Sequence, residues 1–263
     1  MSHSLSLAAQ FFRKPLAIQR RAADMLIASL QNAVERDDRA SRRYGLCNGV
    51  AIIPVQGVLA TNVPWFCEGT SYNWIRAGFD CALQDPEVRA IVFDVNSPGG
   101  EVAGCFDLAD HVYECRGIKP IWSILSESAY SAAYALASTA DYVTVPRTGG
   151  AGSIGVVACH LDFSAALNAA GIKVTYIQYG DRKTDGAAEQ PLSFEAAAKF
   201  QSDIDALGDL FVATVARNRG ISTSKVRGTE AGTFLGAAAV GMGLCDKISS
   251  PNVAFQSLLK KLS

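Results

Sequence analysis

The stretch RAIVFDVNSPGGEVAGCFDLADHVYEC, residues 89–115, decides the fold. Its first part, residues 89–96, is a short apolar and β-branched run, typical of a strand buried on both faces. SPGG at residues 97–100 breaks the run, and residues 101–115 follow with the apolar spacing of an amphipathic helix. A strand, a glycine break and a helix in this order predict one βα unit.

The same alternation runs through the chain from residue 50 onward. Apolar runs predict further strands at 50–59, 120–125, 142–146 and 173–178. Amphipathic or alanine-rich runs predict helices at 71–83, 131–140, 161–171 and 193–217, with a small helix and a last short strand within 234–248. Short strands that alternate with helices indicate the α/β class, with a sheet covered on both faces.

The first part of the chain has a different texture. Apolar residues recur there at helical spacing between basic and charged stretches, namely Met25, Leu26, Leu30 and Val34. We therefore predict three parts: an N-terminal helical arm at 1–45, an α/β domain at 46–250 and a C-terminal helix at 251–263. Two roles for the arm stay open, because an apolar stripe at a chain end either folds back on the core or meets a partner.

Composition limits the classes of function. The 263 residues are 49% hydrophobic and 19% charged, enough apolar material for a large core, and the net charge of −1 gives no case for nucleic-acid binding. The seven cysteines form no Cys-x-x-Cys pair and there are only three histidines, so we predict no disulfide framework, no metal and no cofactor. No apolar run reaches the roughly 20 residues that span a bilayer, which predicts a cytoplasmic protein without a membrane partner.

Two strand-to-helix junctions could carry chemistry. NSPGG at residues 96–100 either forms a tight turn or exposes backbone amides that bind an oxyanion. Ser131 opens an alanine-rich helix just after a strand, where it either caps the helix or acts as a nucleophile at the sheet edge on which open α/β folds place their sites. GAGSIG around Ser153 misses the Gly-x-Ser-x-Gly elbow, because Ala151 stands where a glycine is required.

A serine nucleophile needs a base. His3 lies near the start of the chain, and neither His111 nor His160 has an obvious carboxylate orienter nearby in sequence, so a Ser–His–Asp triad is poorly supported. The alternative is a serine–lysine dyad, and the loop GDRKTDG at 180–186 supplies Lys183. A lysine works as a base only where burial or nearby positive charge disfavours its ammonium form. A solvated surface lysine is the plainer interpretation of this loop.

Six segments in order resemble the signal peptide peptidase A family of serine–lysine peptidases, and within it the phage capsid-maturation (prohead) proteases. The resemblance runs from about Val50 to Asp246. The segments are IVFDVNSPGG (91–100), SESAYSAAYALAS (126–138), GGAGSIGVV (149–157), YGDRKTDG (179–186), FVATVARNRG (211–220) and AAAVGMGLCD (237–246).

The resemblance implies a Clp/crotonase-like fold of stacked βαβ units. It places the family's nucleophile on Ser131, its general base on Lys183, and on Ser153 the serine that keeps the lysine amine aimed. It also implies oxyanion-hole amides at Gly100 and Ala132. Two departures stand out: alanines replace the two glycines that follow the nucleophile in the bacterial membrane enzymes, and the transmembrane anchor of those enzymes is not found in this sequence.

The resemblance further implies a serine endopeptidase that cleaves scaffold, portal or coat proteins during phage capsid maturation, in the host cytoplasm or the procapsid. We expect a homo-oligomer, in which Lys183 of one subunit reaches Ser131 of a neighbour. Three alternatives stay open: a soluble signal-peptide or quality-control peptidase of a bacterial cell, a crotonase-like acyl-CoA enzyme, and a non-catalytic assembly protein.

Overall fold

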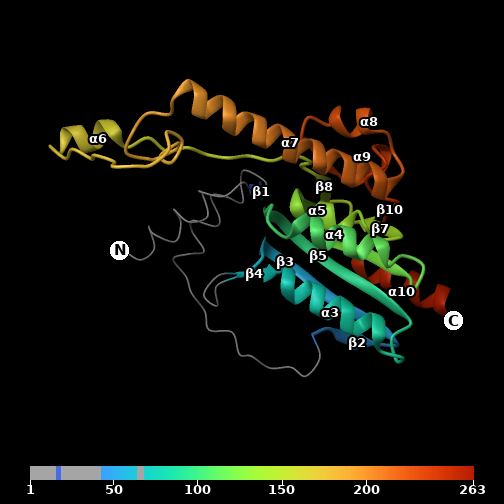
Figure 1. The fold of residues 1–263 in the computed structure, drawn as a ribbon. Helices are drawn as coiled ribbons and strands as arrows, with labels where there is room; N and C mark the ends of the chain where they lie inside the picture. The colour runs from blue at the N-terminus through green and yellow to red at the C-terminus, as the bar shows by residue number, and fades with distance from the viewer. Residues whose placement is uncertain (1–15, 19–42, 64–67) are drawn as a thin grey trace.

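The structure is a computed structural model that describes residues 16–18, 43–63 and 68–263 (Figure 1). Its strands are β1 (Leu16–Ile18), β2 (Gly45–Cys47), β3 (Val50–Ala60), β4 (Gly69–Ser71), β5 (Ala90–Glu101), β6 (Ile121–Tyr130), β7 (Tyr142–Val145), β8 (Gly150–Gly152), β9 (Thr233–Leu235) and β10 (Lys247–Ile248). Its helices are α3 (Tyr72–Gln84), α4 (Cys105–Glu114), α5 (Ala132–Ala137), α6 (Ser164–Ala169), α7 (Phe194–Arg219), α8 (Thr223–Arg227), α9 (Gly236–Gly241) and α10 (Pro251–Leu262).

The described strands form one mixed sheet with the central order β10-β7-β6-β5-β3-β2. Neighbours from β3 to β10 run parallel, as expected for strands joined by helices, and β2 adds an antiparallel edge. Three short strands extend this path: β4 pairs with β3, β8 pairs with β6, and β9 pairs with β8. The predicted α/β class with a sheet built from βαβ units is confirmed.

Helices cover both faces of the sheet. On one face α3, α4 and α5 enclose the larger core, and the second half of α7 closes it from outside with Phe211 and Val215. On the other face Ala254 and Leu258 of α10 pack against the outer side chains of β3, β5 and β6. This second layer covers only part of that face of the sheet. Lys261 of α10 lies over the rings of Trp122 and Tyr142.

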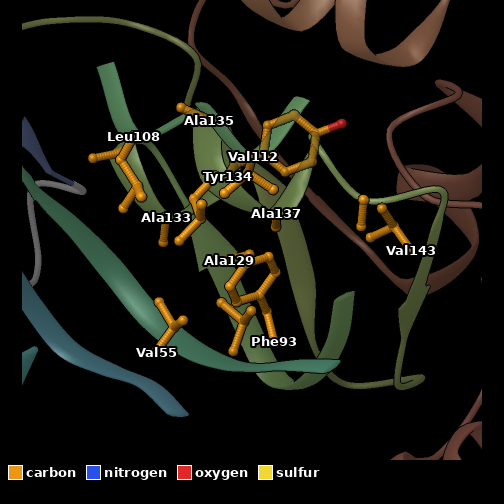
Figure 2. Packing of buried hydrophobic residues seen from close by; sticks show 14 of the residues in the cluster. Val55, Phe93, Leu108, Val112, Ala129, Ala133, Tyr134, Ala135, Ala137 and Val143 are labelled. Atoms are coloured by element: carbon orange, nitrogen blue, oxygen red, sulfur yellow. The ribbon is translucent and has the colours of Figure 1, made fainter. Parts of the chain in front are cut away.

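The short helix α5 lies in the middle of the larger core (Figure 2). All six of its residues are buried, and four of them are alanines. These small side chains let the helix fit between Phe93 of β5 and Leu108 and Val112 of α4. The helix at the first candidate site is therefore fixed by packing on every side.

Two segments differ from the sequence prediction. SPGG at 97–100 does not end the strand, because β5 continues to Glu101 after a register irregularity between Val95 and Ser97. Residues 173–178, predicted as a strand, pair with no strand among the described residues and lie in an exposed, extended segment. A strand exists through hydrogen bonds to a neighbour, and the described part of the chain supplies none there.

Most of the predicted N-terminal arm, including its apolar stripe, lies outside the described residues. Its described parts are Leu16–Ile18, a strand on β5, and residues 43–45, where β2 begins. In the described ranges no helix combines the length and apolar character needed to cross a membrane.

Candidate active site

Ser131 lies at the turn between β6 and α5. It is 1% exposed, and its backbone has φ +53° and ψ −124°, a conformation that costs a non-glycine residue roughly 1–3 kcal/mol. Hydrogen bonds hold it there: its N–H donates to the carbonyl of Gly152 at 2.8 Å, and its carbonyl accepts from the amides of Tyr134 and Ala135 at 2.8 and 3.0 Å. Strain held by so many contacts is typical of a functional position.

The turn that contains Ser153 lies directly against Ser131. The Ser131 hydroxyl faces the carbonyl of Gly155 at 3.4 Å, longer than an ordinary O–H···O bond, so this contact holds the hydroxyl only weakly. Ser153 also has a positive φ, +54°, and its N–H donates to the carbonyl of Gly232 at 2.8 Å. The fold therefore brings the Ser131 and Ser153 segments together.

Gly100 lies on β5, the strand against which α5 packs. A Cβ at this position would be only 1.7 Å from the carbonyl oxygen of Leu59 on β3, so any side chain is excluded. Gly99 before it has φ +104°, and its N–H donates to the Ser97 hydroxyl at 3.1 Å. The close approach of β3 thus requires glycine at 100, and the positive φ favours glycine at 99, whatever further role the Gly100 amide has.

Ala132 is the first residue of α5 and is fully buried. The first amides of a helix have no acceptor within the helix. Since the Ser131 carbonyl takes the bonds of Tyr134 and Ala135, the amide of Ala132 belongs to this unpaired set. Such N–H groups suit a developing negative charge.

Lys183 lies apart from these residues. The segment between β8 and α7 runs out from the core together with α6, and Lys183 is exposed on a turn of this extension (Figure 1). Its backbone N–H donates to the Gly180 carbonyl at 3.2 Å, and next to it Arg182 pairs with Asp185 at 3.4 Å. Among the described contacts the Ser131 hydroxyl reaches a carbonyl and no amine.

The extension, residues 157–193, is unusually apolar for an exposed segment. Eight large apolar side chains of this range are exposed: Val157, Leu161, Phe163, Ile172, Val174, Tyr176, Ile177 and Tyr179. The last two have their side chains almost fully in water, at 99% and 102% relative exposure. Exposed apolar side chains gathered in one segment are typical of a surface that contacts another protein.

Two other reactive groups near α5 are poor nucleophiles. The thiol of Cys105 lies 3.6 Å from the Ala132 carbonyl, but burial raises its pKa to about 12, so it stays protonated at neutral pH. Burial also raises the pKa of Tyr72 well above its usual value, and its hydroxyl donates to the Glu101 carbonyl at 2.7 Å.

His111 is not placed to act as a base for Ser131. His111 does have a carboxylate partner, Asp80, with 2.6 Å between Nε2 and Oδ1, a pair that the sequence does not reveal. However, His111 lies six residues beyond Cys105 on α4, about 9 Å further along the helix axis. Nor do the described residues contain a group of three or more His, Cys, Asp or Glu side chains arranged to hold a metal ion.

Arg116 is a site-supporting residue that sequence reasoning misses. Its guanidinium lies at the C-terminal end of α5 and donates to the carbonyls of Thr139 and Ala140, both at 2.6 Å. A positive charge at this end of a helix satisfies carbonyls that lack an amide partner. The side chain thus fixes α5 from the end opposite to Ser131. No local pattern signals this role, because the contacts join segments distant in sequence.

Comparison with known proteins identifies the family of the chain. Residues 114–263, more than half of the chain, match Peptidase family S49. The chain belongs to this family. It is 36% identical over 222 residues to Capsid assembly protease C of Escherichia phage lambda, covering 82% of this chain and 51% of that protein. It is 34% identical over 241 residues to Head-tail preconnector protein GP5 of Enterobacteria phage P21, covering 90% and 48%.

A more distant relative of this S49 chain is the Putative signal peptide peptidase SppA of Enterococcus faecium, 29% identical over 68% of the chain. The chain spans about half the length of these curated relatives. Among solved structures an enoyl-CoA hydratase from Shewanella pealeana aligns with a TM-score of 0.52 over 83% of this chain and 72% of that one, at 10% identity. This likeness confirms the crotonase-like fold and carries no argument for acyl-CoA chemistry.

Proposed function

We propose that this S49 family member is a serine endopeptidase in which Ser131 attacks the peptide carbonyl and Lys183 of a second copy takes the proton. The proposal rests on one observation: within a single chain, Ser131 and Lys183 lie in different surroundings. Ser131 is strained and buried against Ser153, whereas Lys183 lies exposed on an apolar extension. A second copy that covers the extension would remove water from the lysine amine, which favours its neutral form.

The chemistry follows from these positions. The neutral Lys183 amine accepts the hydroxyl proton as Ser131 Oγ bonds to the carbonyl carbon. The oxyanion is stabilised by the amides of Gly100 and Ala132, each donor contributing about 3–4 kcal/mol. Lys183 then returns the proton to the leaving amine, and water hydrolyses the acyl-enzyme. Ser153, whose turn touches Ser131, holds the lysine amine in line.

The proposed substrates are scaffold, portal or coat proteins of a phage capsid. Support comes from the names of two relatives, a capsid assembly protease and a head-tail preconnector protein, which match four fifths or more of this chain. The enzyme would cleave these proteins while they are gathered in an assembling capsid. A mixture of purified capsid proteins is therefore the substrate of choice for activity measurements.

Subunit mixing tests the proposal. Ser131→Ala and Lys183→Ala should each lower proteolysis by about a thousandfold or more, and Ser131→Ala should abolish labelling by a fluorophosphonate. When the two inactive proteins are mixed under assembly conditions, sites that combine an intact Ser131 with an intact Lys183 should restore activity. The matched control mixes Ser131→Ala with the double variant, which cannot form an intact site.

Each outcome is informative. Full activity in either single variant would refute the dyad. If both single variants are inactive and their mixture also stays inactive while the wild type cuts, the contribution of a second copy is refuted. Undiminished activity of wild-type protein that sedimentation shows to be monomeric would refute it as well.

A further inference from the structure

A short strand near the start of the chain lies on the sheet at the proposed site. Strand β1, Leu16–Ile18, pairs antiparallel with the end of β5 (Figure 1). Its register sets Ala17 opposite Gly100, with Leu16 opposite Glu101 and Ile18 opposite Gly99. The residue proposed to stabilise the oxyanion is thus the centre of this short ladder.

The sheet topology shows which edge β1 occupies. On one side of β5 the neighbour is β3, which stays paired as far as Gly100. On the other side the neighbour is β6, whose last pair is Ala129 with Ser97. Beyond that pair β6 ends and the chain turns at Ser131 into α5. On the β6 side, Gly99–Glu101 therefore has no partner from β6, and β1 pairs there instead.

This vacated edge is where an extended substrate can be aligned. A peptide bond that Ser131 attacks has to lie beside the end of β6, with its carbonyl oxygen toward the Gly100 amide. An exposed strand edge binds an extended peptide through main-chain hydrogen bonds, largely independent of sequence. In the described structure the edge of Gly99–Glu101 contains Gly100 and lies just beyond the point where β6 stops pairing with β5, shortly before Ser131.

We propose that β1 is an internal ligand of the substrate-binding edge, an extended segment of the chain that competes with substrate for Gly99–Glu101. This inference rests on the proposed function, because it takes Ser131 and Gly100 as the reacting centre. An incoming peptide has to displace β1 before it can pair with β5. The segment thus raises the substrate concentration needed for half-maximal rate and leaves the rate at saturation unchanged.

The test is a proline substitution in the full chain. Ala17→Pro removes the central amide of β1, and a proline cannot donate to the ladder. Ala17→Val is the matched control, because it keeps the amide and favours extended backbone. With a fluorogenic peptide, we expect Ala17→Pro to lower KM about tenfold at unchanged kcat and Ala17→Val to leave both near the wild-type values.

Two further measurements do not depend on turnover. Hydrogen–deuterium exchange of the backbone amides at 99–101 should be faster in Ala17→Pro than in Ala17→Val. A synthetic peptide with the sequence of residues 12–22, added to the Ala17→Pro protein, should slow this exchange again and inhibit competitively.

The outcomes separate this inference from the proposed function. If the wild type cuts peptides and Ser131→Ala does not, but Ala17→Pro changes neither KM nor exchange, the internal ligand is refuted and the peptidase stands. A rise in kcat at unchanged KM would also refute competition. If neither the wild type nor Ala17→Pro cuts or labels, the proposed function fails and the inference falls with it.

Discussion

Replacing Arg116 with methionine should loosen the helix that carries Ser131. The guanidinium makes two short bonds at 2.6 Å, to the carbonyls of Thr139 and Ala140, and its Nη2 also donates to the Asn218 carbonyl at 3.1 Å. A hydrogen bond to a charged group contributes about 1.5–3 kcal/mol. Counting only the two short bonds at the lower end, because the side chain is 26% exposed, gives a loss of about 3 kcal/mol.

Arg217→Met is the matched control, since both arginines lie over the ring of Tyr113. The guanidinium carbons of Arg116 and Arg217 are 4.6 and 4.4 Å from the ring centroid. Arg217 has an exposed ion pair with Asp110 in place of the helix-end carbonyls. The pair and the cation–π contact together contribute about 1 kcal/mol. The two variants therefore differ mainly in the hydrogen bonds at the end of α5.

The assay is urea unfolding followed by tryptophan fluorescence, with fluorophosphonate labelling of Ser131 on the folded protein. We expect Arg116→Met to lose about 2 kcal/mol more than Arg217→Met and to label about tenfold more slowly, because small displacements of a catalytic group cost rate. Equal losses of stability in the two variants, or an unchanged labelling rate in Arg116→Met, would show that the arginine does not position α5.

Further predictions concern two glycines, two thiols and the extension. Gly100→Ala should lower the free energy of unfolding by about 3 kcal/mol or more, since its Cβ would lie 1.7 Å from a β3 carbonyl oxygen. Gly208→Ala, in open space within α7, should raise the free energy of unfolding by about 0.8 kcal/mol. Urea unfolding of the two variants measures both changes. Burial raises the pKa of Cys105 and Cys245 to about 12, so their contribution to stability is complete below about pH 8.5 and falls above it by about 1.4 kcal/mol per pH unit for each thiol. A Cys105→Ala/Cys245→Ala double variant should flatten the decline of urea midpoints from pH 8 to pH 10, and an equally steep decline would contradict this. Ile177→Asp should shift sedimentation toward smaller species and lower activity together, and unchanged assembly would contradict a role of the extension.

Local sequence patterns predict much of the fold. The apolar runs that become β3, β5 and β7 and the amphipathic runs that become α3 and α7 follow the periods of strand and helix, so their order predicts an α/β sheet. The junction at Ser131 is visible for the same reason, because a buried strand meets an alanine-rich helix there. The family match extends these patterns, while the roles of Ser131, Lys183 and the other site residues stay predictions.

What sequence reasoning misses depends on contacts between distant segments. SPGG reads as a break, but β5 continues through it because Gly100 lets the backbone of β3 approach closely. Residues 173–178 read as a strand from composition alone, yet strand formation requires a partner. The contacts of Arg116 with α5, and those of β1 with β5, join segments with no local signature in common.

Covalent attachment gives β1 a particular kind of influence. A segment tethered to its own binding edge has an effective concentration that does not change when the protein is diluted. The proposed contact between copies through the extension would obey mass action and would therefore weaken on dilution. Lowering the protein concentration would therefore separate subunits while leaving the edge of β5 as fully occupied as before.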